Sequence, residues 1–161
     1  MFVILYLFSA FYVQTRPAPV KPPATPHRFT ACALVTKSDV EQAIGHPVDG
    51  GAEETHGPVS TCDYAGARGM VSITIQQLAA KPDLVVEIAS LKKEIPEGTA
   101  RNATGFDTAS FFFDIPGAGT QLHIIIGERQ HLMVSILGFG EPLETSGAAE
   151  RIARRAISRL Q

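Results

Sequence analysis

The sequence predicts an α+β fold: a single antiparallel sheet of about five strands with helices packed on one face, in the order α-ββ-α-βββ-α. The first reason is that short apolar runs follow one another in pairs or triplets, whereas a doubly wound parallel sheet needs a helix between consecutive strands. The second is residues 70–77, where apolar and polar residues alternate as in a strand with one wet face. The third is a closing segment, residues 149–160, whose apolar residues recur at helical spacing.

The first helix is expected to begin at Thr36. Thr36 and Asp39 form a variant of the capping box, in which the hydroxyl accepts a hydrogen bond from a first-turn amide and the carboxylate lies at the positive helix end. Gly45 is expected to end the helix in the left-handed conformation, with Pro47 after it. The glycine-rich and polar residues 46–59 are expected to form a loop.

The remaining elements follow from apolar periodicity and from proline positions. Two strands are expected at about 60–65 and 70–77. Pro82 then opens a second helix, because proline is tolerated in the first turn, and Pro96 ends it. Three further strands are expected near residues 108–114, 119–126 and 131–138. The last helix has an unbroken apolar stripe, made of Ala149, Ile152, Ala153, Ala156, Ile157 and Leu160.

Length and composition indicate one globular domain. The chain has 161 residues, of which 45% are hydrophobic and 19% charged, and its formal net charge is −2 at pH 7. Nucleic-acid-binding domains normally carry a clear basic excess, so nucleic acid is not expected among the partners.

The amino-terminal segment predicts export. Residues 1–13 are apolar and uncharged, and they are too few to span a bilayer. They suit either the apolar part of a secretory signal or an uncleaved anchoring segment. Residues 14–30 are rich in proline and predict a stiff linker. Residues 31–161 then form a single α+β domain tied by a disulfide, and any membrane association runs only through the amino-terminal segment.

Cys32 and Cys62 are the two cysteines of the chain, and each lies beside a predicted element boundary. This arrangement suits a structural disulfide between the first helix and the first strand, worth roughly 3–4 kcal/mol for a loop of this size. In a reducing compartment the same residues would be buried thiols or a redox switch. The segment from Phe29 to Cys32 is also distantly similar to a lipoprotein processing site, in which case Cys32 would carry a lipid.

The segment around these cysteines resembles small uncharacterised secreted or lipoprotein domains of bacteria. Those domains show the motifs Cys-x-Leu-x-Thr-x-x-Asp-Val, then Leu/Ile-Gly, then Cys-x-Tyr. The matching residues here are Cys32, Leu34, Thr36, Asp39, Val40, Ile44, Gly45, Cys62 and Tyr64. The match covers residues 32–77. The resemblance implies a disulfide between the two cysteines, an envelope or extracellular location, and no established catalytic residues.

His123 and His131 are the first candidates for chemistry. Apolar alternation places both on the outer face of a predicted hairpin, close enough to be neighbours. They are either part of a zinc or copper site or two polar residues on a solvated face, and no acidic residue or cysteine obviously completes a ligand shell. A looser metal site or a plain polar loop is expected from His46, Asp49, Glu53, Glu54 and His56.

The last helix and a phenylalanine run supply candidates for partner binding. The polar side of the helix carries arginines that are either solvated or able to dock an acidic partner or anionic lipid: Arg151, Arg154, Arg155 and Arg159. Phe112 is the middle ring of three consecutive phenylalanines, so it either marks an exposed binding patch or is buried in a strand covered on both sides.

These observations favour an exported, non-catalytic module that binds an unknown protein or small ligand at the cell envelope. The location can be periplasmic, extracellular or membrane-anchored. The sequence contains no nucleophile elbow and no phosphate-binding loop, so neither catalytic residues nor a cofactor are expected. Two alternatives stay open: a small hydrolase or metal-dependent enzyme that uses His123 and His131, and a cytosolic thiol redox switch.

Overall fold

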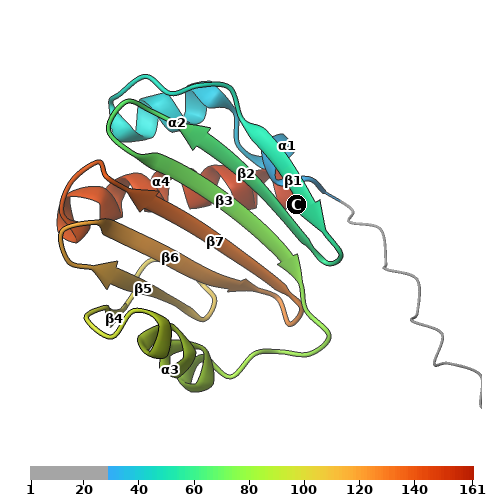
Figure 1. Cartoon of the computed structure of the whole chain (residues 1–161). Coiled ribbons are helices and arrows are strands. Elements are labelled where there is room, and N and C mark those ends of the chain that lie inside the picture. Colours follow the sequence, from blue (N-terminus) through green and yellow to red (C-terminus); the bar gives the residue numbers. More distant parts are fainter. Residues whose placement is uncertain (1–28) are drawn as a thin grey trace, which may run out of the picture.

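A computed structural model describes residues 29–161, so the predicted apolar segment 1–13 and most of the predicted linker 14–30 lie outside the described residues. These residues form one antiparallel sheet with the strand order β1-β2-β3-β7-β6-β5-β4 (Figure 1). The strands are β1 (Ala52–His56), β2 (Val59–Ala65), β3 (Met70–Gln77), β4 (Thr99–Asn102), β5 (Ser110–Ile115), β6 (Gly119–Ile126) and β7 (Gln130–Leu137). The helices are α1 (Ala31–Leu34), α2 (Lys37–Ile44), α3 (Leu84–Glu94) and α4 (Pro142–Leu160).

The prediction of about five strands is wrong, because the described sheet has seven. The two additional strands, β1 and β4, are its outer edges. All five residues of β1 are exposed, so this strand lacks the alternation by which strands are recognised, and its segment was expected to be part of a loop. Strand β4 has only four residues, none of them buried.

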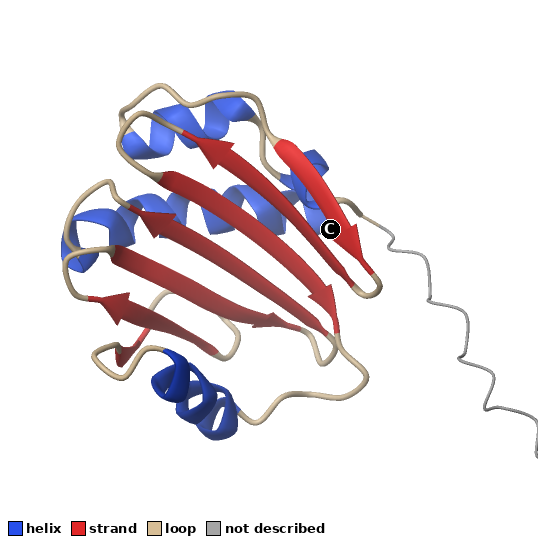
Figure 2. Ribbon diagram, in the orientation of Figure 1, coloured by secondary structure: helices blue, strands red, loops and turns tan. Residues whose placement is uncertain are grey.

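One face of the sheet is covered by α1, α2 and α4, and the main core lies between them (Figure 2). Small side chains on α4 allow it to lie close to β6 and β7: Ala148, Ala149, Ala153 and Ala156, with Ile152 among them. Facing them are buried aliphatic residues of the central strands, including Ile73, Leu122, Ile124, Val134 and Ile136.

The other face carries α3, so the prediction that helices pack on one face only is also wrong. The apolar stripe of α3, Leu84, Ile88 and Leu91, packs on Phe111 and Phe113 of β5. Strand β5 therefore contributes buried aromatic rings to both sides, since Phe112 points into the main core while its neighbours meet α3. Phe112 is 1% exposed, which corrects the suggestion that it marks a binding patch.

The predicted start of α2 is confirmed. The Thr36 hydroxyl accepts a hydrogen bond from the Asp39 amide (3.3 Å), and the Asp39 carboxylate accepts one from the Thr36 amide (2.9 Å), completing a reciprocal capping box. Gly45 follows at φ 71°, the left-handed conformation that glycine adopts without strain.

A disulfide joins Cys32 of α1 to Cys62 of β2, with their Cα atoms 5.0 Å apart. Gly51 packs against this bond, because a Cβ at that position would lie 2.6 Å from the Cys62 sulfur. The Tyr64 hydroxyl donates a hydrogen bond to the Val35 carbonyl, and burial raises the pKa of Tyr64, as do the nearby negative charges. The start of the domain is thus attached to the sheet covalently and by a buried hydrogen bond. Among the described residues, no helix is long and apolar enough to cross a bilayer.

Candidate functional site

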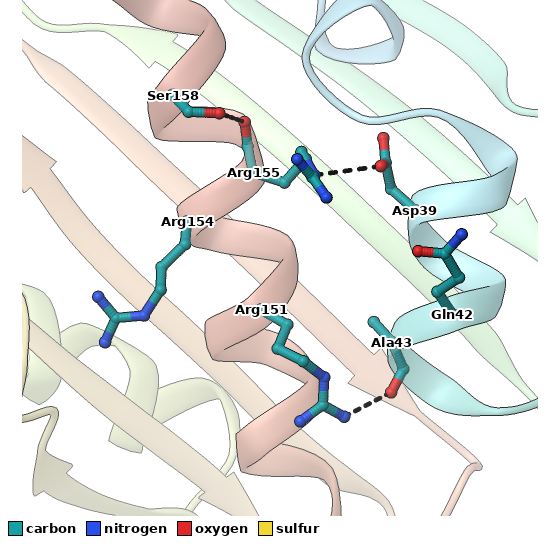
Figure 3. Close-up of a pocket in the computed structure, with 7 residues that line it drawn as sticks. All are labelled: Asp39, Gln42, Ala43, Arg151, Arg154, Arg155 and Ser158. Atoms are coloured by element: carbon teal, nitrogen blue, oxygen red, sulfur yellow. Dashed lines mark hydrogen bonds and ion pairs between the residues drawn. The ribbon is translucent and has the colours of Figure 1, made fainter.

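A groove of about 490 Å³ runs over the surface where α4 lies beside α2 (Figure 3). The residues that line it are Asp39, Gln42, Ala43, Arg151, Arg154, Arg155 and Ser158. Helix α4 supplies three arginines because its apolar stripe faces the sheet and leaves the polar flank toward α2 and solvent. Arg151 and Arg155 point toward α2, whereas Arg154 extends to the other side of α4 (Figure 3).

The arginines are held by bonds that leave much of their donor capacity unused. Arg151 donates to the Ala43 carbonyl near the end of α2 (2.7 Å), and Arg154 donates to the Gly105 carbonyl (2.9 Å). The Arg154 guanidinium also lies 4.6 Å from the centre of the Phe106 ring. A guanidinium has five N–H donors. Arg151 and Arg154 each make one hydrogen bond to the described residues, so both retain donors for a ligand.

Asp39 is the one carboxylate among the described residues that line the groove. It pairs with Arg155 (3.2 Å) and with Arg159 (2.7 Å). Burial alone would raise the pKa of Asp39, but hydrogen bonds from Arg159 and Thr36 and the charge of Arg159 outweigh this effect and lower that pKa to about 2. The carboxylate therefore stays ionised at neutral pH and offsets one of the arginine charges.

Three of the four predicted arginines line one groove, and the fourth, Arg159, bonds to α1 and α2 instead. Arg159 does not line the groove and instead donates to the Leu34 carbonyl and to Asp39, both at 2.7 Å. It thereby connects α4 to α1 and α2. Phe112, the other predicted partner-binding residue, lies in the core beneath the Arg101 guanidinium, which is 3.9 Å from its ring centre.

The two candidate histidines lie on the opposite face of the sheet, next to α3. Nδ1 of His123 is 3.1 Å from Nε2 of His131, so the expectation that the two are neighbours is confirmed. The register places them diagonally, since His123 is opposite Met133 and His131 is opposite Ile125. The expectation of a solvated face is wrong: His123 is 2% and His131 8% exposed.

The histidine pair is buried by aromatic and helical neighbours. The ring of His123 stacks on Phe111, with 4.5 Å between ring centres. Nδ1 of His131 lies 3.8 Å from a carboxylate oxygen of Glu87, which α3 supplies. Burial, together with the adjacent His131, lowers the pKa of His123 to about 3. Burial also lowers the pKa of His131, against the opposing effect of Glu87. Both rings are thus held neutral.

Sequence reasoning missed Glu87, although a signal was present. Its position is three residues after Leu84 and four before Leu91, within the helical stripe that packs against the sheet. An acidic residue in an otherwise apolar stripe is a candidate for a buried polar contact. The partner of that contact could not be named until α3 was known to pack on β5, where Glu87 comes near His131 of β7.

The structure does not bring the five predicted loop residues together as a metal site. Within the described part of the chain, the groups able to hold a metal are Glu87 with the two histidines, and Glu53 with the disulfide cysteines. Glu53 accepts hydrogen bonds from the amides of Ala31 (3.1 Å) and Cys32 (2.7 Å), so it caps α1. Because both sulfurs are in a disulfide, this second group has no thiolate to offer.

Comparison with known proteins adds no relative from which a role could be transferred. The resemblance between residues 32–77 and small secreted or lipoprotein domains therefore remains a prediction. None of the family models, curated proteins or solved structures compared with this chain matches it.

Proposed function

We propose that this chain is an exported, non-catalytic binding module of the cell envelope whose ligand is anionic and docks in the groove between α2 and α4. The observation that carries the proposal is the charge of the groove: three arginines and one carboxylate line about 490 Å³. Cavities of this size hold small molecules or a few side chains of a partner. Guanidinium groups bind carboxylates and phosphates through paired N–H donors.

The disulfide supports the location. Such bonds persist in oxidising compartments and are rare where thiols are kept reduced. The bond between Cys32 and Cys62 therefore suggests a non-reducing environment. A periplasmic, extracellular or membrane-anchored location, with residues 1–13 as signal or anchor, is part of the proposal. So is membership of the bacterial secreted or lipoprotein domains that the motifs of residues 32–77 resemble.

The chemistry of the groove supports binding rather than catalysis. Ser158, the one hydroxyl-bearing residue among the described lining residues, donates its hydrogen to the Arg155 carbonyl (2.8 Å). Asp39, with a pKa of about 2 and two arginine partners, is a weak proton acceptor at neutral pH. What the groove offers a ligand is cationic hydrogen-bond donors.

The test is a charge reversal in the groove with a matched control on α3. Arg154→Glu with Arg155→Glu is compared with Lys92→Glu with Lys93→Glu, which makes the same change of net charge on exposed residues of another helix. The probes are a glutamate-rich peptide and citrate, titrated calorimetrically at low and high salt. The groove variant should lose at least about tenfold in affinity for one of the probes, with the loss screened by salt.

The two probes separate the possible sources of the anion. Binding of the peptide alone identifies an acidic segment of a protein partner, and binding of citrate alone identifies a small polyanion. Thermal melting of both variants verifies that they fold. Equal affinities in the two variants, or no binding of either probe by the unmodified protein, would contradict the assignment of the groove.

A further inference from the structure

We infer that Glu87, His123 and His131 form a binding site for a divalent transition metal ion of the zinc class, on the face of the sheet that carries α3. This site is independent of the arginine groove, which lies among helices on the other face. Its three ligands come from three elements, α3, β6 and β7, which the sequence separates by up to 44 residues, from Glu87 to His131.

The spacing of the ligand atoms suits one ion. Two atoms bound tetrahedrally to the same zinc, each at about 2.0–2.1 Å, lie roughly 3.3 Å apart. Here Nδ1 of His123 is 3.1 Å from Nε2 of His131, and Glu87 lies 3.8 Å from the other ring nitrogen of His131, Nδ1. One ligand atom from each residue can be chosen so that all three lie within 4.8 Å of one another. Glu87 is the most exposed of the three and can close the remaining gap by a change of rotamer.

The donor set selects the class of metal. Two imidazoles and one carboxylate, with a fourth position left for water or a ligand, form one of the established protein environments for zinc. Imidazole nitrogen is a good ligand for zinc, copper, nickel and iron, whereas calcium and magnesium prefer oxygen.

The burial of the pair is costly unless a ligand compensates for it. Nε2 of His123 is buried and has no hydrogen-bond partner among the described residues. A buried polar atom without a hydrogen-bond partner destabilises a fold. The ring of His123 already stacks on Phe111, so an apolar side chain would serve packing better than an imidazole. Coordination of an ion through Nε2 of His123 would give this atom the partner that it lacks.

Thiolates cannot account for metal binding by this chain when it is oxidised. The sequence contains two cysteines, and both are in the disulfide. Zinc binding by tag-free, oxidised protein must therefore come from histidines and carboxylates. His46 and His56 are histidines outside the proposed site and provide the matched control.

The experiment is a calorimetric titration of the full, tag-free, oxidised chain with Zn²⁺ after treatment with a chelator. The expected result is one ion per chain, with at least about tenfold weaker affinity in Glu87→Gln and a larger loss in His131→Gln. His46→Gln with His56→Gln should bind as the unmodified protein does. The Co²⁺ complex should show ligand-field bands without sulfur charge transfer, and Mg²⁺ and Ca²⁺ should not compete.

Three results would overturn the inference: no stoichiometric binding of Zn²⁺, the same affinity in the site variants as in the unmodified protein, or loss of binding in the control variant. Glu87→Gln should remain folded, because it removes only a charge from a partly exposed side chain. Its fold is verified by circular dichroism before the titration. Failure of the zinc test leaves the arginine groove untouched, because neither probe of that groove involves a metal.

Discussion

The two faces of the sheet differ in what they contribute to the molecule. The first face is covered by α1, α2 and α4 and holds the main core, the disulfide and the buried hydrogen bond of Tyr64. The second face carries α3. Its eleven residues are all described, and none of them is fully buried. Val85 on this helix is 76% exposed. We infer that the first face provides most of the stability of the fold, whereas the second face, with fewer buried apolar residues, contributes less.

Away from α3, the second face of the sheet is polar. Along β3 the residues on this face are Ser72, Thr74 and Gln76, whereas Val71, Ile73 and Ile75 are buried in the core. A face with few apolar contacts can open locally at lower free energy than the core. The following predictions test this difference between the faces.

Removal of the disulfide should have the largest effect. The bond closes a separation of 30 residues, for which loop-entropy arguments give roughly 4 kcal/mol. Cys32→Ala with Cys62→Ala should lower the free energy of unfolding by about that amount, as measured by urea denaturation followed by circular dichroism. A loss below about 1 kcal/mol would show that the first face does not depend on its covalent link.

Truncation of one isoleucine on each face compares them directly. Ile152→Ala removes a side chain that is 1% exposed in the main core and should cost about 3 kcal/mol. Ile88→Ala acts on the partly buried stripe of α3 and should cost about 1 kcal/mol, while Val85→Ala should be nearly neutral. Equal losses for the two isoleucines in urea denaturation would remove the distinction between the faces.

The ion pairs of Asp39 predict a pH dependence for the first face. Its pKa falls from 3.8 to about 2 on folding, so the native state favours the ionised form. The stabilisation is complete above the unfolded pKa and is lost as the pH falls from about 4 to 2. The difference in unfolding free energy between the unmodified protein and Asp39→Asn should therefore shrink over that interval. A difference that is the same at both ends would contradict the role given to Asp39.

The smallest effect is expected from the joint replacement of the histidines. In metal-free protein, His123→Leu with His131→Leu exchanges two buried polar rings for apolar side chains and should change the unfolding free energy by less than about 1 kcal/mol. His131→Leu alone leaves a buried nitrogen of His123 without its partner and should cost about 1–3 kcal/mol. A large loss in the double variant would show that the pair contributes to folding.

The sequence predicted the elements that bury one side against the core. The capping box of Thr36 and the left-handed Gly45 are local devices, so the helix they bound was found with its limits. The edge strands were not found, because β1 has no buried residue and β4 is only four residues long. Edge strands pair on one side only and can do without apolar alternation.

The candidate sites show a similar division. Alternation along the hairpin was enough to place His123 and His131 on one face, but burial of that face depends on α3, which comes from a distant part of the chain. The aromatic rings on both sides of β5 were a sign of a second covering helix, since Phe111 and Phe113 needed cover as much as Phe112 did. The arginines were predicted as a set, whereas their groove requires α2 beside α4.

The position of the disulfide decides how the domain responds to tension applied through the chain before residue 29. Cys32 is in the first helix, so a pull from that direction passes through the sulfur bond directly to Cys62 in β2. The residues between the two cysteines, which include α2 and β1, carry none of this tension. They therefore cannot unfold one after another from that end of the chain, and the sheet itself must be disrupted first.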